Sequence, residues 1–237
     1  MEKTTPKFKV PHNEEEIVFA FPSIGPDTYI AVGKRILEQR MNVPTGDYMA
    51  SLLHIAYCDD SVRDELEFKD IRRIIHGPWL WVFNINLWTS EGVYVVQDLE
   101  SIGRSQLLNQ NDLEKMLKDS KELPNGVRFS KNRKVRFAPK ESYRLKNHTH
   151  ESLAKDGFVI ASYGTEGAKK LGEVSSKFTG WPCVYGLKVD KPEQRVSALG
   201  GIWEFSALGS GWGRISLCID SSEYKTIDSA HAFGILR

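Results

Sequence analysis

The sequence predicts an α+β protein in which helices pack on a mixed or mainly antiparallel sheet. Apolar residues recur at helical spacing mainly within residues 26–76, whereas runs rich in aromatic and β-branched residues dominate from residue 79 onward. The two kinds of element do not alternate regularly, as they would in a doubly wound parallel sheet. The composition, with 41% hydrophobic and 27% charged residues, excludes a long disordered tail, a collagen-like array and a coiled coil.

The first third of the chain reads as one strand followed by three helices. Residues 17–21 form a short apolar run that Pro22 closes, which is typical of a buried strand. Thr45 is a suitable N-cap, because its hydroxyl can accept a hydrogen bond from the first helical turn. Helical spacing predicts helices over residues 26–40, 46–58 and 61–76.

The rest of the chain is predicted to be richer in strands. Residues 79–88 and 93–96 form a hairpin around the turn at 89–92, and residues 127–138 form a second hairpin with its turn at 131–134. Further helices are expected at 112–121, after Thr149 and at 165–178, and further strands at 158–161, 184–189, 202–207, 214–219 and 230–236. Gly200-Gly201 and residues 209–211 are predicted breaks.

The chain is predicted to be a single domain over residues 1–237, with a possible subdivision near 124–126. Its three cysteines, Cys58, Cys183 and Cys218, form no CxxC pair, and the N-terminus lacks the apolar region of a secretory signal. We therefore expect reduced thiols, a soluble intracellular protein and a cytoplasmic location. No run of about 18 apolar residues suggests a membrane span.

The distribution of charge is the clearest unusual feature. The formal net charge is only +1, but residues 128–146 contain eight basic residues and one acidic residue, so this segment carries +7 and the remainder −6. Seven of the basic residues are candidate contacts to a nucleic acid or another polyanion: Arg128, Lys131, Arg133, Lys134, Arg136, Lys140 and Arg144.

Two interpretations of this basic segment stay open. Phe129, Phe137 and Tyr143 are interleaved with the charges, and exposed aromatic rings can stack on bases. Alternatively, the basic residues form a solvated outer face while Phe129 and Phe137 point into the core, because period-2 alternation is typical of a half-buried strand. An acidic protein surface is a further possible partner.

A second candidate site lies in the tryptophan- and glycine-rich region near the C-terminus. A pocket formed by Trp203, Glu204 and Trp212 could hold a small molecule or a carbohydrate, with a carboxylate, or His148 and His150, as the working group. The alternative is a hairpin loop whose large aromatic residues belong to the core.

Two smaller clusters favour structural interpretations. His148, His150 and Glu151 could be metal ligands, but no fourth ligand has suitable spacing, so we expect an N-cap and a first-turn carboxylate, and no metal or cofactor. A stripe on the second helix is interpreted as a solvated or partly packed face rather than a Cys–His pair: Asp47, Ser51, His54 and Cys58.

The sequence thus leaves three functions open. Binding of nucleic acid or another polyanion through residues 128–146 is favoured, because the segregated charge needs an explanation. A small-molecule or carbohydrate-directed enzyme and a protein–protein component without chemistry are the alternatives. Whether the protein is an enzyme, and its oligomeric state, stay undecided.

Overall fold

The computed structural model describes residues 6–97, 102, 108–204, 214–222 and 228–236 of the chain. Within these residues it contains six α-helices: α1 (Tyr29–Glu38), α2 (Gly46–Cys58), α3 (Leu66–Ile75), α4 (Gln110–Met116), α5 (His150–Leu153) and α6 (Gly157–Ser175). Two short 3₁₀ turns lie at Asp60–Val62 and Lys140–Ser142. Helices and strands share the structure without regular alternation, which confirms the predicted α+β class.

The strands of the described chain form two sheets. They are β1 (Lys7–His12), β2 (Glu15–Ala20), β3 (Ile24–Thr28), β4 (Trp79–Trp88), β5 (Gly92–Gln97), β6 (Lys121–Glu122), β7 (Arg128–Phe129), β8 (Val135–Pro139), β9 (Lys146–Asn147), β10 (Cys183–Tyr185), β11 (Glu193–Glu204), β12 (Arg214–Asp220) and β13 (Asp228–Ala232). β1 and β2 pair alone, whereas the large sheet has the order β6-β7-β8-β5-β4-β11-β12-β10-β9, with β13 joining β3 to β4. Most pairs are antiparallel; β10 with β12 and β13 with β4 are parallel.

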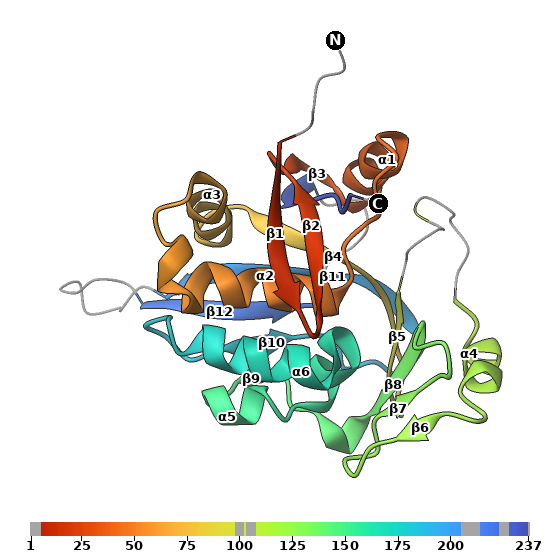
Figure 1. Ribbon diagram of the computed structural model, residues 1–237. Coiled ribbons are helices and arrows are strands. Elements are labelled where there is room, and N and C mark those ends of the chain that lie inside the picture. The colour runs from red at the N-terminus through yellow and green to blue at the C-terminus, as the bar shows by residue number, and fades with distance from the viewer. Residues whose placement is uncertain (1–5, 98–101, 103–107, 205–213, 223–227, 237) are drawn as a thin grey trace.

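β4 is central to the fold because its alternate residues reach both faces of the large sheet. Leu80 and Val82 belong to the main core, which also takes in the apolar faces of α2, α3 and α6. Trp81 and Phe83 point the other way and pack with Tyr29 of α1. Figure 1 shows α2 and α6 lying side by side in front of the sheet, and it is this pair that borders the candidate site.

The elements with strong local signals form where the sequence predicts them. α2 spans the predicted residues, and the Thr45 hydroxyl accepts the backbone N–H of Tyr48 as its N-cap. The predicted hairpin of β4 and β5 is present, and its turn is held by Thr89, whose Oγ1 accepts the backbone N–H of Gly92. β7 and β8 form the second predicted hairpin.

Residues 158–161 correct the sequence-based prediction, because they are helical rather than a strand. They form the first turns of α6, where the Asp156 side chain caps the N–H groups of Phe158 and Val159. All four residues are buried, so the segment is apolar on every side. A short run of this kind has the same pattern in a buried helix and in a buried strand.

The predicted break at Gly200-Gly201 is also wrong, because both glycines lie inside β11. They provide close packing rather than a turn. A Cβ on Gly200 would lie 2.4 Å from the Trp79 ring, and one on Gly201 would lie 2.8 Å from the Ile215 side chain. These positions therefore admit no larger residue without displacing a neighbour.

The prediction of three reduced thiols is contradicted as well. Cys183 and Cys218 are register partners on the parallel strands β10 and β12, and a disulfide joins them. Cys58 is the free thiol. The pairing depends on strands 35 residues apart, which the spacing of cysteines in the sequence does not reveal.

Candidate functional site

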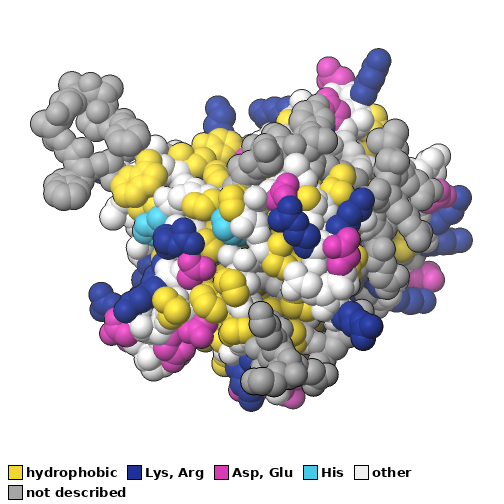
Figure 2. Space-filling view, turned by 90° about the horizontal axis from the view of Figure 1, so that it is seen from above, with side chains coloured by type: hydrophobic (Ala, Val, Ile, Leu, Met, Phe, Trp, Pro, Cys, Tyr) yellow, Lys and Arg dark blue, Asp and Glu magenta, His cyan; other side chains and the backbone are white. Residues whose placement is uncertain are grey.

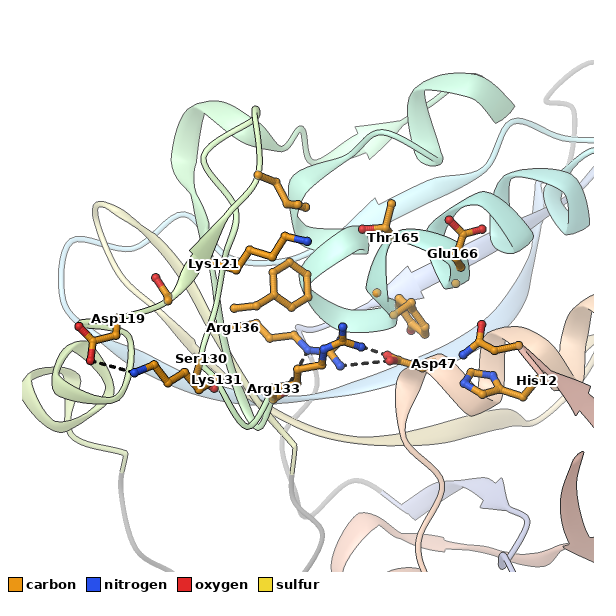
Figure 3. Close-up of a pocket in the computed structure, with 17 residues that line it drawn as sticks. His12, Asp47, Asp119, Lys121, Ser130, Lys131, Arg133, Arg136, Thr165 and Glu166 are labelled. Carbon is orange, nitrogen blue, oxygen red and sulfur yellow. Dashed lines mark hydrogen bonds and ion pairs between the residues drawn. The ribbon is translucent and has the colours of Figure 1, made fainter. Parts of the chain in front are cut away.

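A surface pocket of about 600 Å³ lies between the β6–β7–β8 region and the α2–α6 pair (Figure 3). One wall carries side chains from β6 and from the hairpin of β7 and β8: Lys121, Phe129, Ser130, Lys131, Arg133 and Arg136. The opposite wall comes from the β1–β2 turn, the start of α2 and the middle of α6, with His12, Asp47, Thr165 and Glu166. The pocket thus brings together residues that are up to 155 positions apart in the sequence, from His12 to Gly167.

The hairpin turn places Arg133 at the rim of this pocket. Ser130 and Arg133 are joined by a backbone hydrogen bond of 2.8 Å, and Asn132 Oδ1 accepts from the Ser130 hydroxyl and from the backbone N–H of Lys134. Arg133 has a φ of 57°, in the left-handed region that tight turns use. The result is a compact turn with an exposed guanidinium group at its tip.

Alternation along β7 and β8 sends their cations to opposite faces. Arg128 lies opposite Phe137, with 4.7 Å between the guanidinium carbon and the ring centre, and it also contacts the Glu114 carboxylate of α4 at 2.8 Å. Phe129 lies opposite Arg136 in the same cross-strand relation, at 5.3 Å. Only the second pair faces the pocket.

Arg136 is a buried anchor of the site, with a side chain 2% exposed. Its Nη1 and Nη2 donate to the two carboxylate oxygens of Asp47 at 3.0 and 3.2 Å, which gives a bidentate ion pair. Nη1 also donates to the backbone carbonyl of Ala161 at 3.0 Å. Arg136 therefore ties the hairpin to both helices rather than offering its charge to solvent.

A kink in α6 explains why the backbone carbonyl of Ala161 accepts from a side chain rather than from the next helical turn. Gly164 has φ 75° and ψ 166°, a conformation that is essentially restricted to glycine. The kink interrupts the helical hydrogen bonds, and two buried side chains replace the missing donors: Arg136 at Ala161 and Asn84, whose Nδ2 donates to the Ser162 carbonyl at 3.1 Å. Because the second half of α6 starts afresh at Thr165, its first residues line the pocket.

Four cations line the pocket, and two of them have ion pairs among the described residues. Lys131 contacts Asp119 at 3.3 Å, and Arg136 is neutralised by Asp47. Glu166, the other carboxylate of the lining, pairs with Lys169 outside it at 2.7 Å. This leaves two exposed, uncompensated charges on the hairpin side of the pocket, Lys121 and Arg133.

His12 is the titratable group on the opposite wall. Its Nδ1 lies 2.8 Å from the hydroxyl of Ser51, to which Lys170 also donates at 2.8 Å, and its ring packs edge-on against Tyr48. Burial, assisted by the charge of Lys170, lowers the pKa of His12. The ring is therefore a neutral polar group at neutral pH, held in orientation through Nδ1.

The polar stripe on α2 predicted from the sequence packs against α6 and, at its first residue, against β8. Asp47 pairs with Arg136, Ser51 accepts from Lys170, and His54 Nε2 lies 2.7 Å from Glu173. Burial raises the pKa of the Cys58 thiol at the end of the stripe. The stripe is thus a partly packed helix face, as expected, and Cys58 lacks the lowered pKa of a reactive cysteine.

The remaining residues of the basic segment are spread away from the pocket. Lys134 is exposed at the hairpin turn, while Lys140 lies at the opposite end of β8, where its backbone N–H donates to the backbone carbonyl of Glu91. Arg144 donates to the backbone carbonyl of Asn147 in β9. The sequence missed Lys121, which lies seven residues before the basic segment; the short stretch of strand at β6 brings it back beside the hairpin.

The predicted pocket near the C-terminus falls largely outside the described residues. Trp203 is 48% exposed, and its Nε1 donates to the carbonyl of His76 at 3.3 Å. The side chain of Glu204 and all of Trp212 lie outside the described part of the chain. This pocket therefore stays a sequence-based prediction.

The histidine pair has the structural role expected of it. His148 is buried, with Ser152 Oγ 3.1 Å from its Nδ1 and the carbonyl of Arg144 2.7 Å from its Nε2. His150 Nδ1 lies 2.7 Å from Ser175 Oγ, and Thr149 caps α5. Across the residues that the structure describes, no three His, Cys, Asp or Glu side chains are grouped to hold a metal ion.

The fold and the pocket define an α+β protein with a small, positively rimmed surface site. On the face shown in Figure 2, which looks down on the molecule from above, basic and acidic side chains are interspersed. No helix of the described residues is long and apolar enough to cross a bilayer. Comparison with protein-family profiles, curated proteins and solved structures gives no match, so the geometry of the site alone carries the interpretation.

Proposed function

We propose that this protein binds a phosphate-bearing polyanion, a nucleic-acid strand in the first place, at the pocket beside the hairpin of β7 and β8. The observation that carries the proposal is the pair of uncompensated cations, Lys121 and Arg133, on one side of a cavity of about 600 Å³. Such charges release counterions when they meet phosphate groups, which is the main source of sequence-independent affinity for nucleic acids.

The other groups of the pocket are suited to a strand of nucleic acid. Phe129 is half-buried and contributes an apolar ring, on which part of a base or sugar can pack. Thr165 adds an exposed hydroxyl from α6, opposite the cations (Figure 3). The aromatic ring favours a nucleic acid over an acidic protein surface, which would need charge complementarity alone.

The proposal is tested by fluorescence anisotropy with a labelled single-stranded oligonucleotide at several salt concentrations. The double variant Lys121→Gln/Arg133→Gln should bind more weakly than the unchanged protein. Because a phosphate contact on a single strand contributes about 0.7 to the slope of log K against log salt, the slope should fall by about 1.4.

The matched control is Lys140→Gln/Lys146→Gln. It removes the same charge from exposed positions of the same basic segment, but away from the pocket, at the far end of β8 (Lys140) and in β9 (Lys146). We expect this variant to bind as the unchanged protein does. Equal losses in the two variants would show that the whole segment contributes and that the pocket is not the site; absence of binding at low salt would rule out the proposal.

A further inference from the structure

We infer that the pocket accepts a phosphate monoester, that is, the terminal phosphate of a nucleic-acid strand or of a mononucleotide, in preference to the internal phosphates of a continuous strand. This inference rests on the proposed function and specifies which part of the ligand the site recognises. It follows from the placement of the cations, from their number and from the size of the cavity.

The cations that are free to meet a ligand do not form a row. Lys121 and Arg133 both line the pocket, whereas Lys140 is separated from Arg133 by the length of β8, on the order of 20 Å at about 3.3 Å per residue. Arg128 points to the other face and is paired with Glu114. A strand lying along the hairpin would therefore meet free charge at its two ends and little between them.

The number of free charges fits a dianion. A phosphodiester carries one negative charge, whereas a phosphate monoester carries about 1.5 to 2 at neutral pH and offers three acceptor oxygens. Lys121 and Arg133 supply two positive charges, and an arginine can hold two oxygens of one phosphate. The two cations come from separate elements, β6 and the β7–β8 turn, so they can approach one phosphate from different directions.

The cavity has the dimensions of a small-molecule site. Its volume of about 600 Å³ lies within the range of roughly 300–1,000 Å³ that is usual for such ligands. Its lining combines the cations with an apolar wall at Phe129 and polar groups at His12 and Thr165. Its carboxylates are in ion pairs, Asp47 with Arg136, Asp119 with Lys131 and Glu166 with Lys169. These surroundings suit one nucleotide, with the phosphate at the cations and the nucleoside between the two walls.

The experiment compares two labelled oligonucleotides of the same sequence, one with a 5′-phosphate and one with a 5′-hydroxyl, in the anisotropy assay. We expect the phosphorylated strand to bind about tenfold more tightly or better, because charge-assisted hydrogen bonds to the added phosphate are lost in the other strand. A nucleoside monophosphate should displace it, and the corresponding nucleoside should not. Lys121→Gln/Arg133→Gln should abolish the difference between the strands, and Lys140→Gln/Lys146→Gln should retain it.

The outcomes separate this inference from the proposed function. Salt-sensitive binding that is equal for the two strands and is not displaced by the monophosphate would overturn the inference and leave polyanion binding intact. If the unphosphorylated strand also binds at the same two cations with full affinity, the site recognises internal phosphates and the inference is wrong. If neither strand nor the monophosphate binds at low salt, both proposals fail.

Discussion

Arg136 belongs to a run of basic residues in the sequence, yet its side chain is buried and contributes to packing. By sequence it is one of seven candidate contacts for a polyanion, and its neighbours Arg133 and Lys134 are indeed exposed. Its own guanidinium group is buried against Phe129 and bound by Asp47, a partner 89 positions away. Alternation with Phe137 in the core predicts an outward side chain at residue 136, but both faces of β8 are covered, Phe137 by α4 and Arg136 by α2 and α6. No local pattern reveals this second layer or the carboxylate that makes a buried arginine acceptable.

Replacing Arg136 with methionine should therefore lower the free energy of unfolding by about 3 kcal/mol, since it leaves Asp47 and the Ala161 carbonyl without their donor. Urea denaturation measures this loss. In the double variant Asp47→Asn/Arg136→Met the unpaired charge is absent, so the combined loss should be smaller than the sum of the two single losses. Strictly additive losses would mean that the ion pair contributes nothing to stability.

At the scale of elements, the kink of α6 explains both a success and an error of the sequence-based prediction. The sequence places a boundary between residues 161 and 165, and Gly164 is indeed where the helical backbone is interrupted. The strand predicted for residues 158–161 was wrong because these residues are buried on all sides of the helix. The apolar run therefore lacks the 3.6-residue period that identifies an amphipathic helix. The strand predicted there is one of the segments whose type only long-range packing decides.

Substituting Gly164 with alanine should lower the free energy of unfolding by about 1–3 kcal/mol. The conformation at φ 75°, ψ 166° is strained for any residue with a Cβ, and that Cβ would also lie 3.2 Å from Asp47 Oδ2. Gly77→Ala is the control, because Gly77 has ordinary φ and its nearest neighbour would be 3.6 Å away. We expect the control to change stability by less than about 0.5 kcal/mol in thermal or urea unfolding; equal effects at the two positions would contradict the role of the kink.

At the scale of the whole molecule, the sequence reveals the class of fold but not its assembly. Local signals predict α2 and the two hairpins, because capping, alternation and turn residues act over a few positions. The insertion of β11 between β4 and β12 depends on contacts about 100 residues apart and has no local signature. The same holds for the site: the hairpin cations were predicted, whereas His12 and Lys121 join them only through the folded arrangement. The single-domain organisation and the cytoplasmic location stay predictions, and the oligomeric state stays undecided.

The pairing of cysteines connects the fold to the compartment in which it forms. In the oxidised protein, a maleimide reagent applied after unfolding without reductant should label one thiol per chain, Cys58, and three thiols after reduction. The disulfide closes 35 residues, so reduction should lower the free energy of unfolding by about 4 kcal/mol in the chain-entropy description. For the labelling experiment Cys58→Ser is the control, because this variant should have no thiol to label before reduction. The native state of the pair is measured by adding the maleimide reagent when the protein is isolated, before any thiol can oxidise. Three labelled thiols per chain in this experiment would show that Cys183 and Cys218 face each other as a reduced pair, and the expectation of a reducing compartment would then stand.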